Sequence, residues 1–223
     1  MAWYHGYIKY MQETFDLAGI QFGGISAGCQ PCVCLGTNLD ANVFWNEWFV
    51  PFIKDTYDSR QHPLIFPHTT FMDISRELLR KIISEESVAR NSTRIHLATT
   101  NMPLVTHTSE SNFTSFDDLF DCIVATQYVP FICGPMTYQC RGNNVIDGGV
   151  GLKYKNYTPM GTDFTHFYVN VPADAISNIF SLVDIGNMEF HNKLRNDGYE
   201  AAKHCTELHS VLDFCKKSSY GVM

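Results

Sequence analysis

Ser26 stands between two glycines, Gly24 and Gly28. A serine with a glycine two positions before and after it fits a sharp strand-to-helix turn, because small neighbours let the backbone bend tightly and leave the hydroxyl exposed. Such a turn also puts backbone N–H groups of a helix N-terminus, including that of Ala27, where they can point at a developing oxyanion. Residues 20–23 read as a short buried strand leading into the turn. We therefore predict that Ser26 is a nucleophile, although a pattern with three fixed positions also arises by chance.

Asp147 is the candidate base. It follows a short apolar strand end at residues 144–146 and precedes Gly148 and Gly149, which leave its carboxylate uncrowded and let another backbone approach closely. An Asp-Gly pair is also common in ordinary turns. Upstream, residues 115–126 begin with a serine that can cap a helix, carry an acid three positions later, and continue with apolar residues at helical spacing.

The order of these segments resembles the patatin-like phospholipase family, in which G-x-S-x-G is followed by A-[ST]-x-x-x-P and then by D-G-G. Here the three motifs are residues 24–28, 125–130 and 147–149, and the two candidate catalytic residues are 121 positions apart (147 minus 26). Residues 6–13 are similar to the family's first helix. The resemblance covers most of the chain. It implies an α/β fold, a three-layer α/β/α sandwich with a mostly parallel central sheet, in a single domain over residues 1–223.

The resemblance also implies an activity. Ser26 would attack a fatty-acyl ester of a phospholipid or glyceride while Asp147 accepts its proton, and an acyl-enzyme would form and then hydrolyse. This Ser-Asp dyad needs neither a cofactor nor a metal. The substrate would be met at a membrane or lipid-droplet surface by a cytoplasmic protein that associates peripherally with membranes. The residues expected to support the motif and the oxyanion are Gly24, Ala27, Gly28, Gly148 and Gly149.

One family feature falls outside the sequence. The family has a glycine-rich loop between its first strand and first helix, and that loop supplies oxyanion donors; aligned through Gly6, it would lie at or just before Met1. We therefore expect the first strand and the loop to be missing and the domain to be incomplete at its N-terminus. Loss of one oxyanion donor typically costs about 10²–10³ in turnover. A catalytically weak or silent homologue that binds lipid or a protein is thus the alternative function.

Composition excludes several classes of protein. The chain has 223 residues, of which 45% are hydrophobic, enough for one sizeable core. A net charge of -7 and the lack of a basic stripe argue against a nucleic-acid partner. The sequence has neither an apolar run long enough to span a bilayer nor a signal segment at its start, so we expect no transmembrane segment.

The cysteines after the turn offer other chemistry. Cys29, Cys32 and Cys34 form a C-x-x-C-x-C run that could bind a metal or form a disulfide. No second pair with ligand spacing accompanies it, so we expect small buried side chains.

A conventional Ser-Asp-His triad is the rival mechanism. The order nucleophile, acid, histidine would be satisfied by Ser26, Asp147 and one of four later histidines, namely His166, His191, His204 or His209. Only 25 residues precede Ser26, however, and an α/β-hydrolase elbow normally follows several strands. The dyad is therefore preferred.

Hydrophobic spacing predicts the remaining elements. Helices are expected over residues 5–15, 42–57, 73–89 and 176–215, with Gly186 and Gly198 interrupting the last, and strands over residues 94–99 and 164–171. The aromatic residues of the second helix share a face that Pro51 interrupts. They either pack in the core or form an apolar wall for an acyl chain; these residues are Trp45, Trp48, Phe49 and Phe52.

Overall fold

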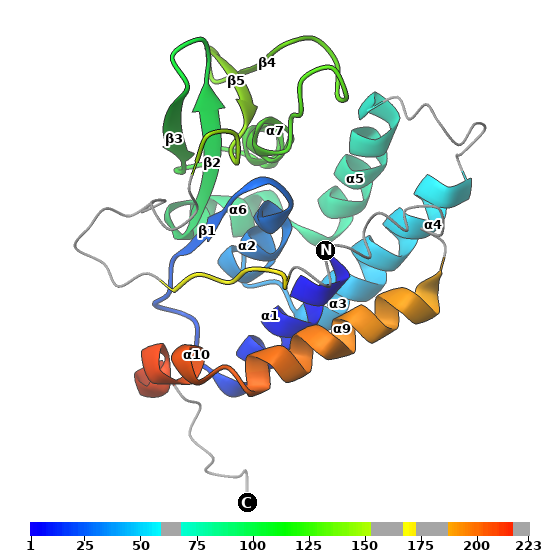
Figure 1. Ribbon diagram of the computed structural model, residues 1–223, viewed down its shortest axis with the longest axis vertical. Helices are drawn as coiled ribbons and strands as arrows, with labels where there is room; N and C mark the ends of the chain where they lie inside the picture. The colour runs from blue at the N-terminus through cyan, green and yellow to red at the C-terminus, as the bar shows by residue number, and fades with distance from the viewer. Residues whose placement is uncertain (59–67, 153–166, 173–186, 216–223) are drawn as a thin grey trace, which may run out of the picture.

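The fold is a small mixed sheet with helices packed around it (Figure 1). A computed structural model describes residues 1–58, 68–152, 167–172 and 187–215. The strands are β1 (Phe22–Gly24), β2 (Ile95–Asn101), β3 (Thr106–Glu110), β4 (Tyr138–Cys140) and β5 (Asn143–Asp147). The helices are α1 (Ala2–Thr14), α2 (Cys29–Gly36), α3 (Ala41–Val43), α4 (Val50–Asp58), α5 (His68–Ile82), α6 (Glu85–Asn91), α7 (Phe116–Thr126), α9 (Met188–Lys203) and α10 (Thr206–Val211). Short 3-10 turns lie at Ser26–Gly28 (η1), Ser92–Arg94 (η3) and Asp213–Cys215 (η6), and a π-helix at Phe44–Phe49 (η2).

Strand β2 organises the sheet. Its residue Leu97 pairs with Gly24 of β1 and with Glu110 of β3, while Thr99 pairs with Asp147 of β5 and with Thr108 of β3. A strand residue has one neighbour on each side, so β3 takes one edge of β2, and β1 and β5 share the other. β1 runs parallel to β2 and β5 runs antiparallel to it. The two strands therefore approach each other head-on and end two β2 residues apart.

The expectation of a mostly parallel sheet is wrong for the strands that the structure describes. Among them only β1–β2 is a parallel pair, whereas β2–β3, β2–β5 and β4–β5 are antiparallel. The connections explain the difference, because residues 102–105 join β2 to β3 and residues 141–142 join β4 to β5, and links this short allow only antiparallel pairing. The α/β class holds, while the three-layer arrangement and the single domain stay predictions.

Helices α2 and α7 contact β2 and also contact each other, so they cover the same face of the sheet. Helices α1 and α9 cross further from the sheet, at the lower end of the molecule in Figure 1. Glycines allow this crossing: a Cβ on Gly6 would lie 1.7 Å from the Arg195 carbonyl oxygen, and one on Gly198 would lie 1.9 Å from that of Trp3. Gly198 does not interrupt α9, because its missing side chain is what lets α1 approach.

The aromatic segment after Asp40 is continuously helical through α3, η2 and α4. Pro51 does not break the helix, although proline has no N–H to donate, because the wider π turn that ends at Phe49 carries the chain into α4. All four aromatic side chains named above are buried in the main core, which confirms that they pack there.

Other predicted elements are confirmed with changed bounds. The predicted helix at 73–89 is two helices, α5 and α6, because Ser84 caps α6 by accepting a hydrogen bond from the Ser87 N–H. The predicted strand at 94–99 is β2. Residues 164–166 and 176–186 lie outside the described residues, and residues 167–171 form no strand. Among the helices that the structure describes, none is long and apolar enough to cross a membrane.

Candidate active site

The head-on meeting of β1 and β5 brings Ser26 to Asp147. Ser26 lies two residues beyond the end of β1, and Asp147 is the last residue of β5. The Ser26 hydroxyl donates a hydrogen bond to Asp147 Oδ2 at 2.7 Å. Two residues separated by 121 positions are thus joined by a hydrogen bond, which is the contact that a proton transfer between them would need.

The turn at Ser26 has strained backbone geometry. Its φ of 51° lies in the left-handed region, which non-glycine residues seldom adopt and which is often found at functional sites. Gly24 is needed for the turn to close, since a Cβ there would lie 2.7 Å from Cys29 Cα. A Cβ on Gly28, by contrast, would point into open space, and the residue takes an ordinary helical conformation. The two motif glycines therefore differ in their structural roles.

Asp147 is a buried carboxyl group, only 6% exposed. Burial raises its pKa, because the charged form loses hydration, whereas hydrogen bonds from the Ser26 hydroxyl and the Gly149 N–H oppose the rise. The Gly149 N–H donates to Oδ1 at 2.7 Å, so each carboxyl oxygen has a donor. Gly148 allows the chain to leave β5 close to β2, as a Cβ there would lie 2.1 Å from the Ala98 carbonyl oxygen.

The end of α7 holds both halves of the site together. Thr126 Oγ1 accepts a hydrogen bond from the Ser26 N–H at 3.1 Å, and its carbonyl oxygen accepts one from Gly148 at 3.1 Å. Two residues on, the Tyr128 carbonyl oxygen accepts the Asp147 N–H at 2.7 Å. Thr126 was not among the predicted site residues, although it is the hydroxyl residue of the A-[ST]-x-x-x-P motif and could have been found from that position.

The backbone donors near Ser26 are unequally available. The Ser26 N–H is bonded to Thr126, and the Gly28 N–H donates to the Ile25 carbonyl oxygen at 2.8 Å. Ala27 is the second residue of η1, where helix geometry provides no intrahelical acceptor. Ala27 and Gly28 are the two residues of this turn that were expected to support the oxyanion. Of these, Ala27 has the N–H that fits an oxyanion hole.

The three cysteines after the elbow are buried and turn to different partners. Cys32 donates to the Phe22 carbonyl oxygen at 3.1 Å, Cys34 donates to that of Leu39 at 3.3 Å, and Cys29 accepts from the Gln127 side chain at 2.7 Å. Burial raises the pKa of the Cys32 thiol to about 12. The prediction that they are small buried side chains is confirmed.

The histidines of the rival triad make other contacts. His204 pairs with Glu200, and His209 hydrogen-bonds to the Tyr10 hydroxyl at 3.1 Å. His191 packs edge-on against the Phe49 ring, and His166 lies outside the described residues. The Ser26 hydroxyl donates to a carboxylate rather than to an imidazole.

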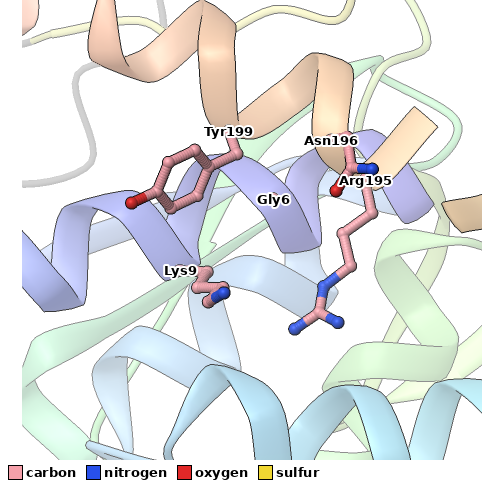
Figure 2. A pocket seen from close by; sticks show the side chains of 5 residues that line it. All are labelled: Gly6, Lys9, Arg195, Asn196 and Tyr199. Carbon is pink, nitrogen blue, oxygen red and sulfur yellow. The ribbon is translucent and has the colours of Figure 1, made fainter. Parts of the chain in front are cut away.

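A hollow between α1 and α9 lies apart from this chemistry. Figure 2 shows it lined by Gly6, Lys9, Arg195, Asn196 and Tyr199, none of which belongs to the predicted site. Its charged and phenolic groups are engaged locally: Tyr199 donates to Glu13 at 2.7 Å, Lys9 pairs with Glu13, and Arg195 donates to Asn42.

Two curated human proteins are similar to the chain. It is 26% identical over 179 residues to "Patatin-like phospholipase domain-containing protein 2", a match that covers 78% of this chain and 34% of that protein. The resemblance to patatin-like phospholipases is confirmed. The chain is also 29% identical over 143 residues to omega-hydroxyceramide transacylase, covering 63% of this chain and 25% of the relative. The chain thus spans about a third of the length of the first relative and a quarter of the length of the second. Searches of family models and solved structures find no match.

Proposed function

We propose that the chain is a lipid acyl hydrolase whose nucleophile is Ser26 and whose general base is Asp147. The observation that carries this proposal is the 2.7 Å hydrogen bond from a strained elbow serine to a buried carboxylate. The relatives' names support it, since one is called a phospholipase domain protein and the other a transacylase, and both names describe acyl-group chemistry on lipids.

The first half-reaction makes an acyl-enzyme. Ser26 Oγ attacks the ester carbonyl carbon as its proton passes to Asp147 Oδ2, and the negative charge that develops on the carbonyl oxygen is stabilised by the Ala27 N–H. The tetrahedral intermediate then collapses. The bond to the leaving alcohol breaks, and the alcohol takes the proton from Asp147 as it departs.

The second half-reaction releases the fatty acid. Water takes the place of the alcohol and attacks the acyl carbonyl carbon while Asp147 accepts its proton. Collapse of this second intermediate breaks the bond to Ser26 Oγ, which recovers the proton from Asp147. A carboxylate is a weak base at its ordinary pKa of about 3.9, so the burial that raises the pKa of Asp147 favours both proton transfers.

Labelling by a fluorophosphonate probe tests the proposal. We expect the wild-type chain to be labelled, Ser26→Ala to be unlabelled, and Asp147→Asn to label weakly. Ser111→Ala and Asp55→Asn are the matched controls, because both change the same residue types away from the dyad and should label as the wild type does. A folded wild type that stays unlabelled would overturn the hydrolase proposal and favour the weak or silent homologue.

Acyl transfer is a second candidate, favoured by the name of the transacylase relative. The acyl-enzyme is the same, but an alcohol replaces water in the second half-reaction. Adding a long-chain alcohol during turnover separates the two: transfer gives an ester product at the expense of free fatty acid, and hydrolysis leaves the fatty-acid yield unchanged.

A further inference from the structure

Exposed apolar side chains are concentrated in three segments of the chain. Of the eight large apolar side chains that are exposed among the described residues, only Val43 on α3 lies elsewhere. The other seven, here called the apolar rim, are Leu104, Val105, Val129, Phe131, Ile132, Met136 and Val150. Leu104, Phe131 and Ile132 are 80%, 78% and 77% exposed. Monomeric proteins rarely expose such clusters unless they are interaction sites.

Sheet register brings the three segments to one end of the sheet. Asn101, before the 102–105 turn, and Tyr138, after the 129–137 connection, both pair opposite Val145 of β5. In Figure 1 both connections lie at the upper end of the molecule. The third segment joins them, since the Val150 carbonyl oxygen accepts from Thr100 Oγ1 at 3.3 Å and a Cβ on Gly151 would lie 3.3 Å from Val105 Cγ1.

The apolar rim is continuous with the dyad. The Tyr128 carbonyl oxygen accepts the Asp147 N–H, and Val129 is the next residue along the chain. On the other side, the Val150 N–H donates to the Asp147 carbonyl oxygen at 3.1 Å. Two segments of the apolar rim are therefore attached directly to the residue that accepts the Ser26 hydrogen bond.

The fold itself keeps the tip of the rim exposed. Phe131 has a φ of 65°, unusual for a bulky residue, and its N–H donates to the Gly134 carbonyl oxygen at 3.1 Å. The Cys133 N–H donates to the Val129 carbonyl oxygen at 2.9 Å, and the Tyr128 hydroxyl donates to that of Pro135 at 3.1 Å. These bonds close the loop on its inner side and direct Phe131 and Ile132 outward.

We propose that the apolar rim inserts into a zwitterionic phospholipid surface and so presents lipid esters to Ser26, a role that rests on the proposed function. The lack of charged side chains in the segments around the rim favours this partner. Residues 95–109, 122–140 and 148–152 contain no Asp, Glu, Lys or Arg, although 17% of the chain is charged. Attraction to an anionic membrane requires Lys or Arg near the surface. A neutral rim with a Phe at its tip instead matches the boundary between headgroups and acyl chains of a neutral surface.

A tryptophan at the tip tests insertion directly. The variant Phe131→Trp is made in the Ser26→Ala background, so lipid is not consumed, and the native tryptophans are buried and give a constant signal. With phosphatidylcholine vesicles we expect the emission to shift to shorter wavelength and to be quenched when the acyl chains are brominated. Val43→Trp is the matched control and should show neither change. Emission unaffected by vesicles would overturn the proposal, as would emission already typical of a buried indole without vesicles, which would mean that protein covers the rim.

Replacing both apolar side chains at the tip of the rim measures how much the tip contributes to vesicle binding. We expect Phe131→Ser with Ile132→Ser to weaken phosphatidylcholine vesicle binding at least about tenfold, since two large side chains lose their burial. Hydrolysis of a water-soluble short-chain ester should be unchanged. Normal ester hydrolysis with equal vesicle binding by variant and wild type would overturn the rim proposal alone, whereas vesicle binding without ester hydrolysis would overturn the proposed function alone.

Discussion

In the proposed mechanism Asp147 must be ionised to accept the serine proton, yet its burial favours the neutral form. The structure balances these demands with one hydrogen bond to each carboxyl oxygen, from the Ser26 hydroxyl and from the Gly149 N–H. Desolvation is the larger effect, so the pKa of Asp147 is raised. A base with a raised pKa binds the serine proton more strongly during attack.

The pH dependence of activity should report this shift. The base works when deprotonated, so kcat/KM for a soluble ester should rise with pH through the raised pKa of Asp147 and level off above it. We expect the acid limb at a pH above the ordinary aspartate pKa of about 3.9. Asp55→Asn should leave the limb in place. A limb at or below the ordinary value, in protein shown by circular dichroism to be folded, would contradict the assignment of Asp147 as the base.

Thr126 holds the backbone of Ser26, the proposed nucleophile. Replacement by valine keeps the shape but removes the acceptor of the Ser26 N–H, which typically costs about 1–3 kcal/mol when the donor is left unpaired. If that cost falls on the elbow geometry, kcat should drop about tenfold, since 1.4 kcal/mol corresponds to a factor of ten. Thr126→Ser, which keeps the hydroxyl, should restore kcat. Equal kcat values for the valine and serine variants would contradict the positioning role.

At the scale of elements, the site depends on two strands that end against the same edge of β2. The sequence predicts that β1 leads into Ser26 and that an apolar strand ends at Asp147, because both patterns are local. It does not predict that the two strands meet head-on, since that follows from non-local register with Leu97 and Thr99. The antiparallel pairings were not predicted, because the links at residues 102–105 and 141–142 lack a strong hairpin signal such as Asn-Gly.

The two glycines of the elbow should tolerate alanine to different degrees. Gly24→Ala would place its Cβ against the backbone of Cys29 and should lower the free energy of unfolding by about 1–3 kcal/mol. Gly28→Ala meets open space in a helical conformation and should change it by no more than about 1 kcal/mol, in the stabilising direction. Thermal or denaturant unfolding compares them. Equal destabilisation by the two variants would show that the turn is closed differently.

At the scale of the whole molecule, one arginine ties three parts of the fold together. Arg141, in the turn between β4 and β5, donates to both carboxyl oxygens of Asp118 in α7, at 2.9 and 2.7 Å. It also pairs at 3.2 Å with Glu110 at the end of β3, whose side chain is 9% exposed, and lies over the Phe113 ring. The cluster connects the sheet to the helix whose far end carries Thr126.

Loss of this arginine should destabilise the fold. Arg141→Ala leaves Glu110 without its cation, and the expected decrease in the free energy of unfolding is about 1–2 kcal/mol, between the values for exposed and for buried ion pairs, because Glu110 is buried whereas Arg141 is itself exposed. Arg141→Gly should be less harmful by about 1 kcal/mol, because the residue has a φ of 49° that glycine adopts freely. Urea unfolding of the three proteins checks both the size and the order. A glycine variant less stable than the alanine variant would contradict the backbone argument.

Trapping an acyl-enzyme would identify Ser26 as the residue that carries the acyl group during turnover. The protein is mixed with p-nitrophenyl butanoate, quenched with acid within the first turnovers, digested, and analysed by mass spectrometry. We predict a butanoyl group on the peptide that contains Ser26, absent from Ser26→Ala and reduced in Asp147→Asn. A butanoyl group on a different residue, or turnover of the ester by Ser26→Ala at the wild-type rate, would rule out Ser26 as the nucleophile.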